Sequence, residues 1–412
     1  MQQAIIHIGQ LVNVRTESKV IRGKELAVLP VLHHAFIVTE NGLIKAYGSM
    51  DEWDATQYPT ATITDAKGAF VLPAWCDSHT HIVFAASREE EFVDKIKGLS
   101  YAEIAAKGGG ILNSAAKLQA ASEEQLYQQA WQRLQELMQL GTGAIEIKSG
   151  YGLSVEGELK MLRVIKRLKQ EAPIPVKATF LGAHTYPIAY KSNRQGYIDL
   201  VINEMLPVIH EEQLADYIDV FCEEGFFSVP ETELICTAGI QYGLQAKIHA
   251  NQLNCSGGTQ AGVRLGAVSV DHLETMDEEA IHTLAASNTI GTLLPTAAYF
   301  LRMPFQPARR LVDAGCTIAL ASDYNPGSSP SGNMNLVVSM SCIGMKLLPE
   351  EAINAATING AYAMGIGEEA GSITIGKRAN LILTKTIPSL AYLPYAFGTN
   401  LIDRVMIRGQ WI

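Results

Sequence analysis

Eight short apolar runs that alternate with long amphipathic stretches constrain the fold of this chain more than any other feature. The runs are rich in valine, isoleucine and alanine and cover residues 71–76, 143–148, 176–182, 217–222, 244–249, 267–271, 289–294 and 316–322. Strands that are apolar along their whole length, with helices between them, are typical of a parallel sheet covered on both faces. Eight of them favour a closed (β/α)₈ barrel, an α/β fold, over an open doubly wound sheet. No Gly-x-Gly-x-x-Gly follows the first run, which removes the main reason to expect a dinucleotide-binding fold.

Both ends of the chain carry a different pattern. Residues 1–68 contain short β-like runs, and Asn41 and Gly42 between two of them form a strong hairpin signal. From residue 370 onward, short β-like runs return without helices between them. We therefore predict a small β-sandwich domain, built from residues 1–68 and 370–412, beside a barrel formed by residues 69–369.

Charge and hydropathy exclude several classes of partner. The net charge of −10 argues against nucleic acid and anionic membranes, because both require a basic face. No apolar run reaches the length of a membrane span, and no signal peptide is visible at the N-terminus. The six cysteines include no Cys-x-x-Cys and are typical of buried residues in a reducing compartment. We expect a cytoplasmic protein that acts on a small molecule.

Metal-binding residue types gather where the predicted barrel strands end. Five of the ten histidines and one aspartate lie there: His79, His81, His184, His249, His272 and Asp323. Taken singly, each histidine also fits a hydrogen-bonded core residue, and Asp323 fits a helix N-cap. The carboxyl ends of barrel strands meet at one rim, so the set together favours a Zn²⁺ or Fe²⁺ site. Such an ion lowers the pKa of a bound water, which favours hydrolysis.

Longer motifs carry a resemblance to a known family. The matching segments are 77–81, Arg88, 108–111, 146–153, 181–185, 220–223, 247–250, 271–274 and 322–329. The most specific are Lys-Ser-Gly-Tyr-Gly-Leu at 148–153 and Ser-Asp-Tyr-Asn-Pro-Gly-Ser-Ser at 322–329. In these motifs the chain resembles the amidohydrolase superfamily and, within it, the imidazolonepropionase family over nearly its whole length.

The resemblance implies a reaction and a metal site. The family hydrolyses 4-imidazolone-5-propanoate to N-formimidoyl-L-glutamate, the third step of histidine degradation. His79, His81, His249 and Asp323 would hold one Zn²⁺ or Fe²⁺ ion per subunit, a choice that the ligand types leave open. The family also suggests a homodimer.

Further residues acquire expected roles from the same resemblance. Arg88 would bind the propionate of the substrate, and a guanidinium suits a carboxylate. Tyr151 and His184 would contact the ring, and three residues of one loop would face the product: Asn325, Gly327 and Ser328. Without the resemblance, Arg88 reads as a solvated charge beside three glutamates, and the loop reads as an ordinary turn.

Two details bear on the mechanism. Binuclear relatives bridge two metals with a carboxylated lysine, usually at the fourth strand, whereas Lys148 follows the second run, so we expect one metal. Related enzymes often carry a glutamate where this chain has Gln252, which cannot transfer a proton. We therefore expect proton transfer by His272, Asp323 or a water, with Gln252 completing the catalytic group as a hydrogen-bonding contact to the substrate. Hydroxide on the metal, oriented by His272, would attack the ring carbon between the two nitrogens.

Two other functions remain open. One is a mononuclear amidohydrolase that deaminates a purine or pyrimidine base, although a neutral base needs no Arg88. The other is a catalytically impaired metal-binding homologue, with Gln252 as the sign of loss.

Overall fold

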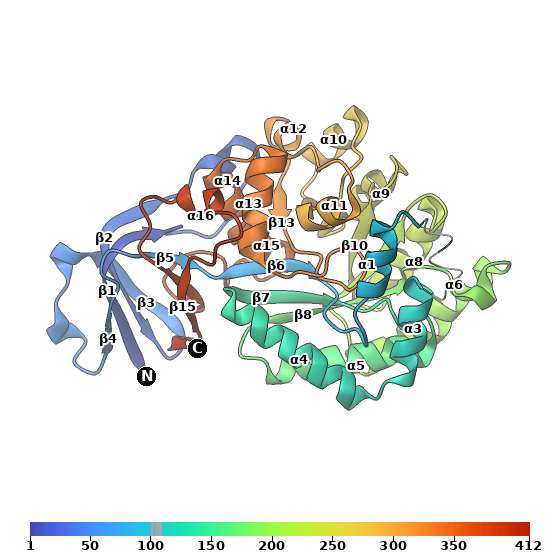
Figure 1. Cartoon of the computed structure of the whole chain (residues 1–412), viewed down its shortest axis with the longest axis horizontal. Coiled ribbons are helices and arrows are strands. Elements are labelled where there is room, and N and C mark those ends of the chain that lie inside the picture. The colour runs from blue at the N-terminus through green and yellow to red at the C-terminus, as the bar shows by residue number, and fades with distance from the viewer. Residues whose placement is uncertain (100–102, 104–108) are drawn as a thin grey trace.

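Eight parallel strands form the barrel that the apolar runs predict (Figure 1). They are β6 (Trp75–Thr80), β7 (Thr142–Lys148), β8 (Val176–Ala183), β9 (Tyr217–Cys222), β10 (Gln245–Ala250), β11 (Ser269–His272), β12 (Ile290–Leu293) and β13 (Ile318–Leu320), paired in chain order. The barrel closes just beyond the last strand, where the backbone N–H of Asp323 donates to the carbonyl of His79 at 3.0 Å. The N–H of His81 donates to the carbonyl of Tyr324 at 2.8 Å. The computed structural model describes residues 1–99, 103 and 109–412, so Gly108 of the 108–111 motif lies outside the described residues.

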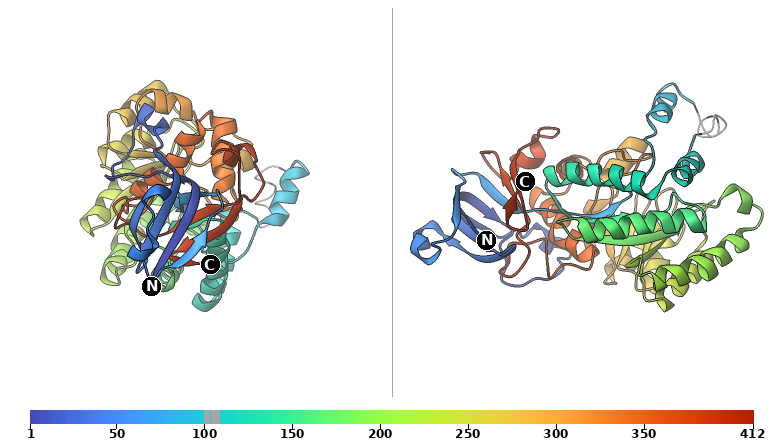
Figure 2. Two further views of the ribbon diagram at one scale, coloured as in Figure 1. Left: turned by 90° about the vertical axis from the view of Figure 1, so that its left-hand side faces the viewer. Right: turned by 90° about the horizontal axis from the view of Figure 1, so that it is seen from below.

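Helices between the strands cover the barrel (Figures 1 and 2). They include α4 (Glu123–Gln139), α5 (Val155–Glu171), α6 (Arg194–Leu200), the π-helical turn η5 (Val201–Met205), α7 (Leu206–Glu211), α8 (Val229–Gln241), α9 (Gly258–Arg264), α10 (Glu278–Ala285), α11 (Pro295–Leu301), α12 (Ala308–Asp313), α13 (Met334–Met345), α14 (Pro349–Ala356) and α15 (Ile358–Ala363). Helix α4 shows why such segments are helical: Ser122 caps its N-terminus, and Leu126, Ala130 and Leu134 recur every fourth residue as its buried side. Helices α1 (Glu89–Ile96) and α3 (Ile111–Ala120) follow the first barrel strand.

The two ends of the chain build one mixed sheet beside the barrel, where both termini lie (Figure 1). Its strands are β1 (Gln2–Val12), β2 (Val31–Glu40), β3 (Leu43–Ser49), β4 (Thr62–Asp65), β5 (Phe70–Pro73), β14 (Leu381–Thr384), β15 (Ile402–Ile407) and β16 (Gln410–Trp411). The predicted fold class is confirmed in its barrel and its terminal β domain. The predicted sandwich is instead a single mixed sheet. The reason is the length of β1, which pairs with β2 on one edge and with β4 and β5 in turn on the other.

The chain passes from this sheet into the barrel at Ala74. Residues 71–76 read as one strand, but β5 pairs with β1 and β14 in the terminal sheet, and β6 begins the barrel. The domain limits at 68/69 and 369/370 stay predictions, and β5 lies just beyond the first of them. Among the described residues, no helix combines the length and the apolar composition that a membrane crossing requires.

Candidate metal centre

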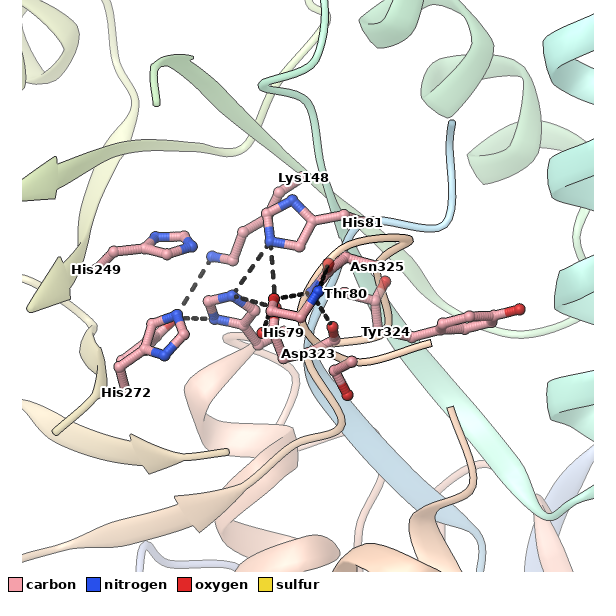
Figure 3. Close-up of polar contacts among 12 residues, drawn as sticks. His79, Thr80, His81, Lys148, His249, His272, Asp323, Tyr324 and Asn325 are labelled. Carbon is pink, nitrogen blue, oxygen red and sulfur yellow. Dashed lines mark hydrogen bonds and ion pairs between the residues drawn. The ribbon is translucent and has the colours of Figure 1, made fainter. Parts of the chain in front are cut away.

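Five side chains converge at the carboxyl end of the barrel (Figure 3). They are His79 and His81 from β6 and the residue after it, His249 from β10, His272 from β11, and Asp323 just past β13. Each is at most 3% exposed. The structure therefore brings together the four predicted ligands from three separate segments of sequence, and it adds His272 to the same cluster.

The spacing of these atoms suits a single ion. The Nε2 atoms of His79 and His81 lie 3.4 Å apart, and each is 3.5 Å from Oδ1 of Asp323. Ligand atoms placed about 2.0–2.2 Å from a central ion, at the corners of a tetrahedron, lie about 3.3–3.6 Å from one another. Ring nitrogens of His79, His81 and His249 lie within 4.8 Å of one another, as do the ligand atoms of His79, His272 and Asp323. The residues present thus fit a divalent cation.

The imidazoles are in the protonation state that a metal ligand needs. Burial, together with the charge of Lys148, lowers the pKa of His79 well below its ordinary value. Burial and the neighbouring His249 do the same to the pKa of His81. Both rings are therefore neutral at physiological pH, which leaves lone pairs for an ion.

Strained backbone holds several of these side chains in place. His272, Leu273 and Asp323 have φ angles of 87°, 66° and 53°, in the left-handed region that non-glycine residues rarely adopt. Such conformations cost of order 1–3 kcal/mol each and cluster at functional sites. At the ends of β11 and β13 they turn the chain where the site residues lie.

His272 has a partner to which the sequence motif assigned no role. Its Nδ1 lies 3.5 Å from Oε1 of Glu274, and the same oxygen accepts a hydrogen bond from the Gln306 amide at 2.9 Å. Burial is the largest single influence and lowers the pKa of His272, but the carboxylates of Glu274, Asp323 and Asp271 together outweigh it and raise the pKa of the imidazole. Glu274 stands in the quoted 271–274 motif, yet only the fold shows which ring it faces.

Most of the predicted substrate residues line one small cavity above the cluster. Its lining is His81, Tyr151, His184, Phe221, His249, Gln252, His272, Asp323, Asn325 and Ser328. Phe221 is an addition, because an aromatic residue inside an apolar strand gives no signal of its own. Gly327 and Arg88 do not line this cavity.

Tyr151 and His184 are held by neighbouring backbone. Nδ1 of His184 lies 3.0 Å from the carbonyl of Gly150, which can only accept, so Nδ1 carries the proton and Nε2 has the lone pair. Burial lowers the pKa of His184 to about 3. The loop of Tyr151 is fixed by the buried Glu158, which accepts hydrogen bonds from the N–H groups of Gly150, Gly152 and Leu153 at 3.0, 2.6 and 3.0 Å. Sequence reasoning missed Glu158.

Arg88 lies at the edge of the site and is already paired. Its Nε and Nη2 donate to Oε2 of Glu91 at 2.9 and 2.6 Å. The other oxygen of Glu91 accepts from the backbone N–H of Gly110 at 2.8 Å. Nη1 packs so closely against Gly327 that a Cβ there would collide with it. Only a glycine at 327 therefore lets the guanidinium reach this position.

The loop after β13 is organised by Asn325. Its Oδ1 accepts hydrogen bonds from the N–H groups of Gly327 and Ser328, both at 2.8 Å, and its Nδ2 donates to the Asp323 carbonyl at 2.6 Å. The Ser328 hydroxyl donates to Oδ2 of Asp323 at 3.3 Å. Asn325 thus shapes the loop, and Ser328 contacts the carboxylate of the metal centre.

Gln252 faces the cavity from a loop that Glu223 secures. The Glu223 carboxylate accepts hydrogen bonds from the backbone N–H groups of Leu253 and Asn254 at 2.9 and 3.3 Å. Gln252 itself is 8% exposed. Its amide can donate and accept hydrogen bonds in the cavity but cannot carry a proton.

Comparisons with known proteins agree with this geometry. The model of the amidohydrolase family matches residues 70–412. An imidazolonepropionase of Flavobacterium johnsoniae is 58% identical over 409 residues, which cover 99% of each chain. One of Christiangramia forsetii is 54% identical over 414 residues and covers both chains fully. Among solved structures, a guanine deaminase of E. coli superposes with a TM-score of 0.75 over 100% of this chain and 99% of its own. Its 12% identity speaks for the fold alone.

Proposed function

The chain belongs to the imidazolonepropionase family of amidohydrolases and is a hydrolase, and from this premise we propose its reaction and the roles of its residues. The substrate is 4-imidazolone-5-propanoate, and the product is N-formimidoyl-L-glutamate. The observation that carries the proposal is the convergence of His79, His81, His249 and Asp323 beneath a cavity lined by Tyr151 and other predicted contacts. The ligand atoms of His79, His81 and Asp323 lie at tetrahedral spacing.

The four convergent residues would hold one Zn²⁺ or Fe²⁺ ion. When bound, such an ion polarises a carbonyl oxygen and lowers the pKa of a water. A second ion bridged by a carboxylated lysine is not supported, because Nζ of Lys148 lies 2.7, 2.8 and 3.4 Å from three carboxylates. An ammonium group in contact with three carboxylates is needed there as their positive partner, so it does not serve as a carboxylated, negatively charged bridge.

Atom balance decides where water attacks. The formimidoyl carbon of the product keeps both of its nitrogens, so the ring bond that breaks joins the carbonyl carbon to nitrogen. Water therefore attacks the carbonyl carbon, and the expectation of attack at the carbon between the two nitrogens is wrong. The new carboxylate becomes the α-carboxylate of glutamate, and the departing nitrogen becomes the terminal N–H of the formimidoyl group.

His272 is the group that handles the proton. With Nδ1 toward Glu274, its Nε2 is free to accept a proton from the attacking water and return it to the departing nitrogen. Gln252 can only position the substrate by hydrogen bonds. His184, with a bare Nε2, accepts a hydrogen bond from a ring N–H, and Arg88 binds the propionate from the edge of the site.

Three finer assignments belong to the same proposal. In this proposal the propionate lies beside Gly327, because the Arg88 guanidinium that would bind it packs against that glycine. The homodimer rests on the family resemblance, and the cytoplasmic location rests on six scattered cysteines without a Cys-x-x-Cys, a pattern typical of a reducing compartment. Size-exclusion chromatography with light scattering tests the homodimer.

One assay tests the function. Purified, metal-analysed protein is incubated with freshly generated imidazolone propionate, and the decay of its ultraviolet absorbance is followed. We expect decay that depends on bound metal and yields formimidoylglutamate by mass spectrometry. No decay with metal bound would refute the proposal and leave the impaired homologue as the better description.

A further inference from the structure

A layer of buried charge lies directly beneath the metal centre. It consists of Glu146, Lys148, Asp219, Lys247 and Asp271, from the four barrel strands β7, β9, β10 and β11, and each is at most 1% exposed. Buried charges are costly unless they are paired, so five in one place call for an explanation. None of them lines the substrate cavity.

Two of the carboxylates face the back of a metal-binding imidazole. Oδ2 of Asp271 lies 2.7 Å from Nδ1 of His79, and Oδ2 of Asp219 lies 2.9 Å from Nδ1 of His249. The Asp271 carboxylate can only accept, so Nδ1 of His79 carries the proton of their hydrogen bond and Nε2 keeps its lone pair for the centre. The contact between Asp219 and His249 is close but not aligned as a hydrogen bond, and it favours the same tautomer through the charge of the carboxylate. His81 differs from both: among the described residues its buried Nδ1 has neither a hydrogen-bond partner nor a carboxylate in ion-pair contact.

The two carboxylates are themselves immobilised. Nζ of Lys148 lies 2.8 Å from Oδ2 of Asp219 and 3.4 Å from Oδ2 of Asp271, so one cation joins both (Figure 3 shows Lys148 among the histidines). Oδ1 of Asp271 accepts from the Ser269 hydroxyl at 2.6 Å, and Oδ1 of Asp219 accepts from the backbone N–H of His249 at 3.1 Å. Both oxygens of each aspartate are therefore engaged, and neither carboxylate can rotate freely.

The remaining members complete the pairing of charges. Oε1 of Glu146 accepts hydrogen bonds from Nζ of Lys148 and from the Thr179 hydroxyl, both at 2.7 Å. Oε2 of Glu146 accepts one from Nζ of Lys247. The layer thus contains three carboxylates against two ammonium groups, which leaves one negative charge below the centre. That excess favours a cation above it.

We infer that Asp271 and Asp219 are positioning residues for the metal, which set the tautomer and the ring angle of His79 and His249, with Lys148 holding both aspartates as one unit. The inference rests on the proposed metal site and deepens it. A merely structural charge layer would change stability when mutated and leave metal affinity unchanged. A positioning layer changes metal affinity, because outer carboxylates of this kind typically contribute 10- to 100-fold.

The experiment measures the Zn²⁺ dissociation constant of the metal-free full-length protein by competition with a chromophoric chelator at one pH. Asp271→Asn and Asp219→Asn keep the size of the side chain and remove its charge, and each is expected to weaken binding about 10- to 100-fold. Ser269→Ala removes a hydrogen bond that holds Asp271 and leaves every charge in place, so a smaller, few-fold loss of Zn²⁺ affinity is expected. Glu351→Gln is the matched control, because Glu351 is a buried carboxylate paired with Arg309 at 2.9 Å and lies on helix α14.

The outcomes separate the two claims. Folded Asp271→Asn and Asp219→Asn proteins that bind Zn²⁺ like the wild type would overturn the inference and leave the proposed metal site intact. If the asparagine variants do not fold, Ser269→Ala decides, and wild-type affinity in that variant overturns the inference. A wild-type protein that binds no Zn²⁺ refutes the proposed metal site and the inference with it.

Discussion

Replacing Arg88 tests how the site recognises a carboxylate. In Arg88→Met the substrate propionate loses a charge-assisted hydrogen bond, which is worth about 1.5–3 kcal/mol. That free energy corresponds to a loss of about 10- to 150-fold in kcat/KM. The loss is expected at the upper end, because Glu91 remains. Its side chain is 11% exposed, and with its partner gone the carboxylate repels the incoming propionate. The effect should appear mainly in KM, since Arg88 does not line the reactive cavity.

The assay is the ultraviolet decay of imidazolone propionate under steady-state conditions. The double variant Arg88→Met/Glu91→Gln removes the repelling charge as well, so it should lose less than the single variant. Arg163→Met is the matched control. Nη2 of Arg163 pairs with Oε1 of Glu212 at a distance of 2.6 Å, and neither residue lines the cavity. An unchanged KM in Arg88→Met, or a double variant worse than the single one, would refute this role.

Three other replacements probe the centre and its surroundings. His272→Ala should keep its metal, measured by elemental analysis, while kcat falls about 10²- to 10⁴-fold, and normal turnover would contradict a proton-handling role. His184→Asn should raise KM but leave the acid limb of the kcat/KM profile in place. Burial lowers the pKa of His184 to about 3, so its ring is already neutral above about pH 4; an acid limb that moves would show that the ring titrates. Lys148→Met leaves three buried carboxylates with one cation and should lower the free energy of unfolding by about 3–5 kcal/mol in urea, against little change for the part-exposed Lys166→Met.

The barrel and its metal ligands could be predicted because their signals are local. Each apolar run overlaps a barrel strand, although the first run is divided between β5 and β6, and His79, His81, His249 and Asp323 stand at or just beyond strand ends in the sequence itself. Once the runs are placed in a closed barrel, topology alone brings these ends to one rim. Tyr151 and Ser328 followed from motif resemblance, and the structure places both in the cavity.

The supporting residues could not be predicted because their partners are distant in the chain. Asp219 and Asp271 are single charges inside apolar strands, and only the barrel shows that each faces a histidine. Glu158 escaped prediction for a different reason: its partners are near in the chain, but they are backbone N–H groups, which leave no side-chain signal in the sequence. The break at Ala74 was invisible for another reason. The strands on both sides of it are apolar, and the pairing partners alone divide β5 from β6.

The most direct test of the account is turnover in ¹⁸O-labelled water, with the product analysed by mass spectrometry. Attack at the carbonyl carbon predicts one ¹⁸O atom in the new carboxylate of formimidoylglutamate, with the formimidoyl group unlabelled, and only when the metal is bound. Label on the carbon between the two nitrogens, or no product from the metal-loaded protein, would contradict it.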